Sequence, residues 1–334
     1  AIINMSTVSE KSEMLANDYV PEAVLAVEME RHTFLTMYDI RGYSFTEEDA
    51  YLTQGQSSIK ILKRSLENAK VLAAKSTHLE KLKVAVAEID NNVATYEQLV
   101  AQTVSVNEQL NELRADMDDA AALFSKNCIT FLESQNTKLE NNITAGASST
   151  ILRERHNKIT WANGIIDILN ELRVANFKAQ ATRELKQYES AINAFDLTIL
   201  LKQLREITRV SDDITNINNI ESSSAAYKKA METYLATWKK KEELNLKRTE
   251  TGTTVLEASQ TVTRAGMDHA KNISIEAVDL LSSANTTMLI GLFISLIVGI
   301  ILALTLTRLI VNPIKLGVEF AKSIAAGDLT ATVD

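Results

Sequence analysis

Residues that interrupt helices are scarce in this sequence, which has only 2 prolines and 10 glycines among 334 residues. Aromatic residues, which are enriched in β-strands, make up only 5% of the chain. Alanine, leucine, glutamate and lysine are abundant, and these residues favour helices. The composition argues against a β-rich or α/β fold and predicts an all-α protein built from long helices.

Groups suited to cross-linking, metal binding or nucleic-acid binding are also scarce. Cys128 is the only cysteine, so no disulfide can form within the chain, which fits either a reducing cytosol or a periplasmic domain. The 4 histidines lack the i, i+4 spacing of a helical metal site, so we expect neither a metal nor a cofactor. The formal charge of -8 is spread along the chain without a basic block, which argues against nucleic-acid binding.

One long run carries no charge. Residues 288–307 read MLIGLFISLIVGIILALTLT, and at about 1.5 Å per residue they span about 30 Å, the thickness of a bilayer core. A buried helix of a soluble protein is the alternative, but such a helix usually keeps a polar edge. Arg308, Lys315 and Lys322 follow, so the positive-inside rule places the C-terminal side in the cytoplasm and residues 1–287 outside. The opening residues AIIN fit the last turn of an earlier membrane helix, so we expect a piece of a longer chain.

The exterior region matches itself at an offset of 142 residues. Arg31 and Arg41 align with Arg173 and Arg183, and the apolar pattern keeps the same offset over more than sixty residues. Generic heptad similarity accounts for part of the match, but the constant offset favours a structural duplication.

Each half is expected to form three helices. Polar and glycine-containing segments divide the chain into helices at about 5–42, 47–74, 77–141, 150–188, 191–209 and from 221 into the membrane. The third and sixth helices are long enough to be shared by two stacked four-helix bundles. We therefore predict a membrane-proximal bundle (about 5–105 plus 250–287), a distal bundle (about 106–249), a membrane helix (288–307) and a cytoplasmic helix (308–334).

Heptad spacing predicts which side chains face the bundle cores. On the first helix the predicted seam is Val20, Val24, Val27, Arg31, Phe34, Tyr38 and Arg41. On the third it is Ile89, Val93, Tyr96, Val100, Thr103, Asn107, Leu110, Arg114, Met117, Ala121, Phe124, Cys128 and Phe131. On the fourth it is Ile166, Leu169, Arg173, Asn176, Gln180 and Arg183, and on the sixth Met231, Leu235, Trp238, Glu242, Asn245, Thr249, Gly252, Leu256, Ser259 and Thr263.

The polar residues on these seams are candidate ligand contacts. Counting helix rise places one set at a similar height in the proximal bundle, namely Arg31, Thr103, Ser259, Thr263 and Arg264. The distal candidates are Arg173, Arg183, Lys202 and Asn245. A buried arginine is costly without an anion, and its planar guanidinium suits a carboxylate, so a small organic acid would satisfy such a site. The structural alternative is that each arginine pairs with a neighbouring carboxylate such as Glu28, Asp39 or Glu242.

The C-terminal residues carry a resemblance to a known family. Pro313 just after the membrane run, and the Gly327-Asp328-Leu329-Thr330 run, resemble the start of a HAMP domain. With the duplicated helical exterior and Arg41-Gly42-Tyr43, the whole chain resembles bacterial chemoreceptors with a helical bimodular sensor domain. This resemblance implies an organic acid bound in the proximal module, acetate in the distal one, and ligand contacts from arginines and threonines such as Arg31, Arg264, Thr103 and Thr263.

The resemblance also implies partners and a location. We expect a homodimer in the bacterial inner membrane, with a periplasmic or extracellular sensor domain and a cytoplasmic kinase and adaptor acting beyond this piece. Ligand binding would shift the sixth helix, which continues into the membrane, and pass the displacement through Pro313. No enzymatic activity is expected from this region. The alternatives are a sensor histidine kinase reading a periplasmic binding protein, and a membrane-anchored coiled coil without a ligand.

Overall fold

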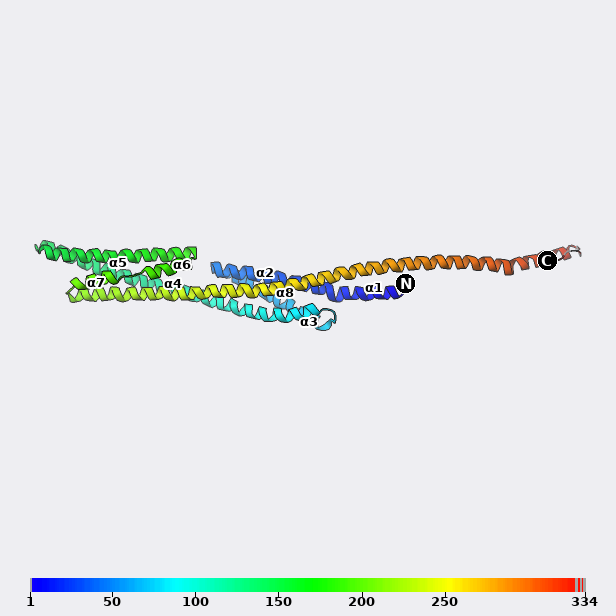
Figure 1. Cartoon of the computed structure of the whole chain (residues 1–334), viewed down its shortest axis with the longest axis horizontal. Helices are drawn as coiled ribbons and strands as arrows, with labels where there is room; N and C mark the ends of the chain where they lie inside the picture. Colours follow the sequence, from blue (N-terminus) through cyan, green and yellow to red (C-terminus); the bar gives the residue numbers. More distant parts are fainter. Residues whose placement is uncertain (1, 328–329, 331, 333–334) are drawn as a thin grey trace. The chain divides into compact units, whose positions relative to one another are not determined.

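The computed structural model describes residues 2–327, 330 and 332, and these residues form helices and turns without a strand (Figure 1). The elements are α1 (Ile2–Met14), π-helical η1 (Leu15–Tyr19), α2 (Val20–Thr46), α3 (Asp49–Lys75), α4 (Glu80–Thr144), α5 (Ser149–Thr182), α6 (Leu185–Ala194), α7 (Thr198–Ile207), α8 (Ser211–Leu306), π-helical η2 (Thr307–Val311) and α9 (Asn312–Ala325). The predicted all-α fold is confirmed.

The chain divides into two compact units. Unit 1 contains Ala1–Glu28, Ser65–Val86 and Ser259–Asp334, and unit 2 contains Met29–Arg64 and Ala87–Ala258. The long helices α4 and α8 contribute to both units, as does the first long hairpin of α2 and α3.

Unit 2 contains the large hydrophobic core, to which α4, α5, α6, α7 and α8 all contribute (Figure 1). Its largest buried side chains include Phe124, Phe131, Tyr188 and Tyr227. A smaller core in the same unit joins α2, α3 and α4 through Ile40, Ile59, Tyr96 and Val100. Close approach of α2 and α3 depends on Gly55, because a Cβ there would lie 2.5 Å from Cδ1 of Ile40.

Unit 1 joins α1, η1 and the first residues of α2 with the last residues of α3, the first residues of α4 and the part of α8 from Ser259 onward. The ring of Tyr19 stacks on His269 with a centroid distance of 5.0 Å. Gly266 of α8 lets the helix approach α2, since a Cβ there would lie 3.3 Å from the backbone nitrogen of Ala23. Glu28 accepts a hydrogen bond of 2.8 Å from Ser65 of α3.

Helix ends in the second half differ from the prediction. The stretch expected as one helix over 150–188 ends at Thr182, because Arg183 adopts a left-handed conformation with φ 60°, and the chain restarts as α6 and then α7. The polar stretch at 211–219, expected as a loop, is the start of α8. Asp212 and Asp213 lie in its first turn, where carboxylates stabilise the N-terminus of a helix.

The seam on α4 is confirmed almost throughout. Every predicted position from Ile89 to Phe131 is buried except Arg114, which is half-buried. Cys128 packs as a buried hydrophobe, as predicted.

The predicted seam on the first helix is wrong. Its members Val20, Val24, Val27, Arg31, Phe34, Tyr38 and Arg41 are all exposed. The face that α2 buries instead carries smaller or polar residues, among them Ala26, Met29, Thr33, Thr36 and Ile40. The apolar pattern therefore identified residues that share one face of α2, but this face is exposed and does not pack in the core.

On α8 the predicted seam is wrong at two positions beyond Trp238. Glu242 and Thr249 are exposed, whereas Lys241 and Arg248, each one residue earlier, are buried. Gly252 and Ser259 are buried as predicted. Two successive three-residue steps, from Trp238 to Lys241 and to Leu244, change the phase of the heptad.

The apolar run lies within a continuous helical stretch. Among the residues that the structure describes, one stretch, Ser211–Ala325, is long and apolar enough to cross a membrane, with a most apolar window of mean hydropathy 2.9 that is not buried. Pro313 lies in the first turn of α9. Asp328 and Leu329 of the predicted HAMP run lie outside the described residues.

Candidate functional site

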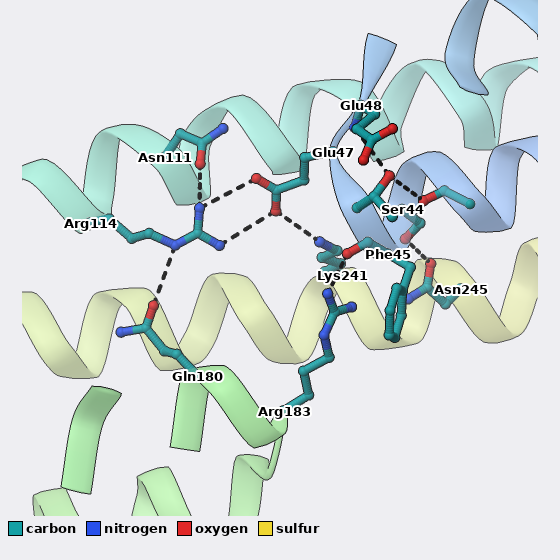
Figure 2. Close-up of polar contacts among 12 residues, drawn as sticks. Ser44, Phe45, Glu47, Glu48, Asn111, Arg114, Gln180, Arg183, Lys241 and Asn245 are labelled. Atoms are coloured by element: carbon teal, nitrogen blue, oxygen red, sulfur yellow. Dashed lines mark hydrogen bonds and ion pairs between the residues drawn. The ribbon is translucent and has the colours of Figure 1, made fainter. Parts of the chain in front are cut away.

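A cavity of about 570 Å³ lies within unit 2, where the end of α2 meets α4, the α5–α6 turn and α8. Both helix ends and helix interiors contribute to it (Figure 2). It is lined by Arg41, Ser44, Phe45, Glu47, Leu110, Arg114, Gln180, Arg183, Leu185, Tyr234, Trp238, Lys241, Glu242, Asn245, Leu246, Arg248 and Thr249.

The cavity has a strong excess of positive charge in an acidic chain. Its five basic side chains are Arg41, Arg114, Arg183, Lys241 and Arg248. Its two carboxylates, Glu47 and Glu242, leave a net of three positive charges. Closely spaced cations in a partly desolvated cavity raise the local concentration of anions.

Glu47 holds two of these cations (Figure 2). Its carboxylate accepts from both terminal nitrogens of Arg114, at 3.3 and 3.4 Å, and from Nζ of Lys241 at 3.4 Å. Burial alone would raise the pKa of the Glu47 carboxyl, but the hydrogen bonds and charges of Arg114 and Lys241 hold that pKa below its ordinary value. The site therefore stabilises an ionised carboxylate.

Two residues at this cavity have unusual backbone conformations. Glu47, after the end of α2, has φ 64°, and Arg183, after the end of α5, has φ 60°. Each left-handed residue that is not glycine costs about 1 kcal/mol. The guanidinium of Arg183 lies over the ring of Phe45, 3.4 Å from its centroid, and donates to the Phe45 carbonyl (Figure 2). The ends of α2 and α5 thus place a carboxylate, Glu47, and a guanidinium, Arg183, at the same cavity, and each does so through an unfavourable backbone conformation.

Arg248 is the most deeply buried of the five basic residues that line the cavity, with 4% of its surface exposed. Its guanidinium donates to Oγ1 of Thr103 at 2.7 Å and to Oδ1 of Asn245 at 3.0 Å. Burial lowers its pKa, and a hydrogen bond to Tyr96 opposes that effect. Among the described residues no carboxylate forms an ion pair with Arg248, so its charge is compensated only by neutral groups.

The predicted proximal residues do not share the cavity. Arg31 is exposed on α2, and Thr103 is buried in unit 2 beside Arg248. Ser259, Thr263 and Arg264 belong to unit 1, where Ser259 is buried, Thr263 is half-buried and Arg264 is exposed. Arg31 and Arg264 are therefore not the desolvated arginines that the sequence suggested.

The predicted distal residues separate into two groups. Arg183 and Asn245 line the cavity, and Asn245 also accepts a hydrogen bond of 2.8 Å from Ser44. Arg173 is half-buried on α5 outside the cavity lining. Lys202 is exposed on α7, beside a separate hollow of about 620 Å³ whose acidic and basic side chains are equal in number.

Sequence reasoning did not select Glu47, Lys241 or Arg248 as site residues. The phase change on α8 explains two of these omissions, because the predicted heptad through Trp238 and Glu242 places Lys241 and Arg248 beside the core and not in it. Glu47 belongs to a short connection that was interpreted only as the start of the next helix.

No family model matches the chain, and no curated protein matches it. A similar solved structure is described as "Crystal Structure of the TorS sensor domain - TorT complex in the presence of TMAO". It shares 11% sequence identity with this chain, covers 73% of it and 99% of its own length, and has a TM-score of 0.39. A similarity at this level adds nothing to the functional argument, which depends on the chain's own residues.

Proposed function

We propose that this chain is the sensor region of a bacterial transmembrane receptor that binds a small organic anion in the cavity of unit 2. The observation that carries the proposal is the net positive cavity, in which the buried Arg248 lacks a carboxylate partner among the described residues. A volume of about 570 Å³ falls within the range of small-molecule sites.

The chemistry of the cavity favours a carboxylic acid. The Glu47 carboxylate already occupies one position, accepting from Arg114 and Lys241. A ligand carboxylate would compete with it there, or bind the basic groups that Glu47 does not reach, principally Arg248 and Arg41. Ser44 and Thr249 also line the cavity, but each hydroxyl now donates its single hydrogen to Asn245 and would have to rotate to donate to a ligand oxygen.

The route of the signal would be α8. This single helix contributes Lys241, Asn245 and Arg248 to the cavity and continues to Leu306 through the apolar run. A ligand that draws these residues toward Arg41 of α2 and Arg114 of α4 would displace α8 by about 1–2 Å, the typical size of a helix shift in an allosteric transition. Pro313, in the first turn of α9, would receive that displacement at the start of a HAMP domain.

We assign the receptor to the chemoreceptors, with binding and signal transmission rather than catalysis as the function of this region. The support is the resemblance of residues 308–334 to the start of a HAMP domain and the long helical exterior. A kinase and an adaptor would act on parts of the receptor beyond this region.

Thermal unfolding of the full chain in detergent, with a panel of C2 to C6 mono-, di- and tricarboxylates, tests the proposal. At least one acid should raise the melting temperature, and raise it further at each higher concentration, because a ligand that binds only the folded state stabilises it by an amount that grows with the logarithm of its concentration. The amide analogue of that acid is the control and should have no effect. A melting temperature unchanged by every acid would count against an organic-acid site.

A further inference from the structure

Glu22 of α2 is a carboxylic acid buried in unit 1. Only 1% of its surface is exposed, and among the described residues no group forms a hydrogen bond with its Oε2 atom. An ionised carboxylate in such a position is costly, because the anion loses its hydration without gaining a hydrogen bond in exchange. The gain of one proton removes this cost.

The carboxyl group of Glu22 lies at the contact between α2 and α8. Its Oε2 atom is 3.3 Å from the position that a Cβ at Gly266 would take, and the backbone nitrogen of Ala23 is also 3.3 Å from that position. About one helical turn away, the ring of Tyr19 stacks on His269 of α8. Glycine at position 266 therefore lets α8 pass directly over the carboxyl group and cover it.

Few charges act on Glu22 from the surrounding helices. Burial raises the pKa of the Glu22 carboxyl to about 7, Asp18 of η1 adds to this effect, and Lys81 of α4 opposes it. The buried residues that α3 contributes to unit 1 carry no titratable group, namely Ser65, Leu66, Ala69 and Ala73. On α8, the charged or titratable residues nearest in sequence to Gly266 are exposed, namely Arg264, Asp268 and His269. Other charged residues of the unit pair with one another, namely Lys11 with Glu276, Lys70 with Glu67 and Lys83 with Glu80.

We propose that Glu22 is a proton-binding site through which unit 1 senses the surrounding pH, with the proton as a ligand separate from the organic anion of unit 2. When Glu22 is protonated, the neutral carboxyl group stays buried and α8 stays against α2. When Glu22 is ionised, water has to reach the carboxylate, so the two helices separate at Gly266. Because α8 continues to Leu306 through the apolar run, this separation enters the membrane segment along the same helix. The proposal does not rest on the anion site.

Distances between spin labels test the proposal. Val24→Cys and Met267→Cys together place labels on exposed neighbours of Ala23 and Gly266, while the buried Cys128 stays unlabelled. In the full chain in detergent, without any organic acid, the distance between the labels should increase as the pH rises from about 5 to about 9, with a midpoint near pH 7. Glu22→Gln, added to the labelled pair, should keep the short distance at every pH, because it resembles the protonated form.

Two charge variants distinguish proton binding at Glu22 from a structural role. Asp18→Asn removes a negative charge that favours the proton, so it should move the midpoint to lower pH. Lys81→Gln removes a positive charge that disfavours the proton, so it should move the midpoint to higher pH. His269→Gln removes a titratable side chain of α8 and should retain a midpoint near pH 7.

Other results would overturn the proposal. A distance between the labels that stays constant across this pH range would show that α8 does not respond to Glu22. A transition that persists in Glu22→Gln, or one that disappears in His269→Gln, would assign the proton to another group. Shifts of the midpoint in the same direction for Asp18→Asn and Lys81→Gln would contradict a proton bound at Glu22.

Discussion

Glu47 and Arg114 form a two-point ion pair in the cavity of unit 2, with donor–acceptor distances of 3.3 and 3.4 Å, although they lie 67 positions apart. A carboxylate held by both terminal nitrogens of a guanidinium has the geometry by which proteins bind organic acids. Glu47 therefore shows what the cavity can hold and also limits what else can bind there. An incoming carboxylate has to displace Glu47 or use the cations that it leaves free.

Replacing Glu47 separates these two effects. Glu47→Gln should lower the free energy of unfolding by about 1–2 kcal/mol, because the charge-assisted hydrogen bonds to Arg114 and Lys241 are lost. The same change should increase affinity for an added carboxylate about ten-fold, since both cations become available. Glu48→Gln, next to it and exposed, is the control and should change neither quantity. Equal effects of the two substitutions on affinity would show that Glu47 does not occupy the ligand position.

Trp238 should report ligand binding directly. It lines the cavity, and its ring lies 5.8 Å from that of Tyr188 and 6.0 Å from that of Tyr234. An anion bound in this cavity changes the electric field at the indole, so we expect the tryptophan fluorescence to change on titration. Trp238→Phe should abolish the change, whereas Trp161→Phe should retain it, because Trp161 packs against the hydrophobic core and does not line the cavity. A signal lost with Trp161 instead would place the ligand elsewhere.

Glu22 should make the stability of the chain depend on pH. Burial, with a smaller effect of Asp18, raises the pKa of Glu22 to about 7. The folded state then binds this proton more tightly than the unfolded state, so the contribution is complete below a pH of about 4.5 and is lost as the pH rises to about 7. Glu22→Gln, which resembles the protonated form, should stabilise the chain by about 2 kcal/mol at about pH 8 and by little at about pH 4.

Chemical denaturation at the two pH values measures this difference. Glu10→Gln, on the exposed surface of α1, is the control and should follow the parent at both values. A Glu22→Gln variant with the same pH profile as the parent would mean that this carboxyl ionises in the folded state as it does in water.

Close packing of α2 and α3 should make one glycine sensitive to a single methyl group. A Cβ at Gly55 would lie 2.5 Å from Cδ1 and 2.8 Å from Cγ1 of the buried Ile40. Gly55→Ala should therefore destabilise the chain by about 1–3 kcal/mol. At Gly164 of α5 the nearest atom is Cδ1 of Leu200 at an ordinary 3.4 Å, so Gly164→Ala should stabilise by up to about 1 kcal/mol. Melting curves that rank the two variants in the opposite order would contradict this packing.

The sequence predicted the helices better than their environments. On α4, large apolar residues and a regular heptad coincide, so every predicted position but Arg114 is buried. On α2 the core takes Ala26, Met29, Thr33 and Thr36, and the larger apolar residues face outward, so hydrophobicity selected the wrong face. Burial of smaller side chains is decided by how closely the helices approach, which depends on contacts between distant segments.

The site was predicted only in its chemistry. A buried arginine was expected and is found, but it is Arg248 rather than Arg31, and the carboxylic-acid ligand stays a prediction. A charged residue is normally assigned to the solvent side of a helix, and only the phase change after Trp238 turns Lys241 and Arg248 inward. Glu47 and Arg183 enter the cavity because both chain segments turn through left-handed conformations, which a sequence without glycine at those positions does not announce.

Calorimetric titration of the full chain in detergent with C2 to C6 carboxylates tests the central claim most directly, when parent, Arg248→Gln and Lys247→Gln are compared. Lys247 is an exposed neighbour that pairs with Glu243, so its variant controls for a simple loss of charge. The account predicts that one or more acids bind the parent and the Lys247→Gln variant alike, and bind Arg248→Gln about 10- to 100-fold more weakly. Unchanged affinity in an Arg248→Gln variant that melts cooperatively would contradict an anion site at this cavity, as would the absence of binding by every acid.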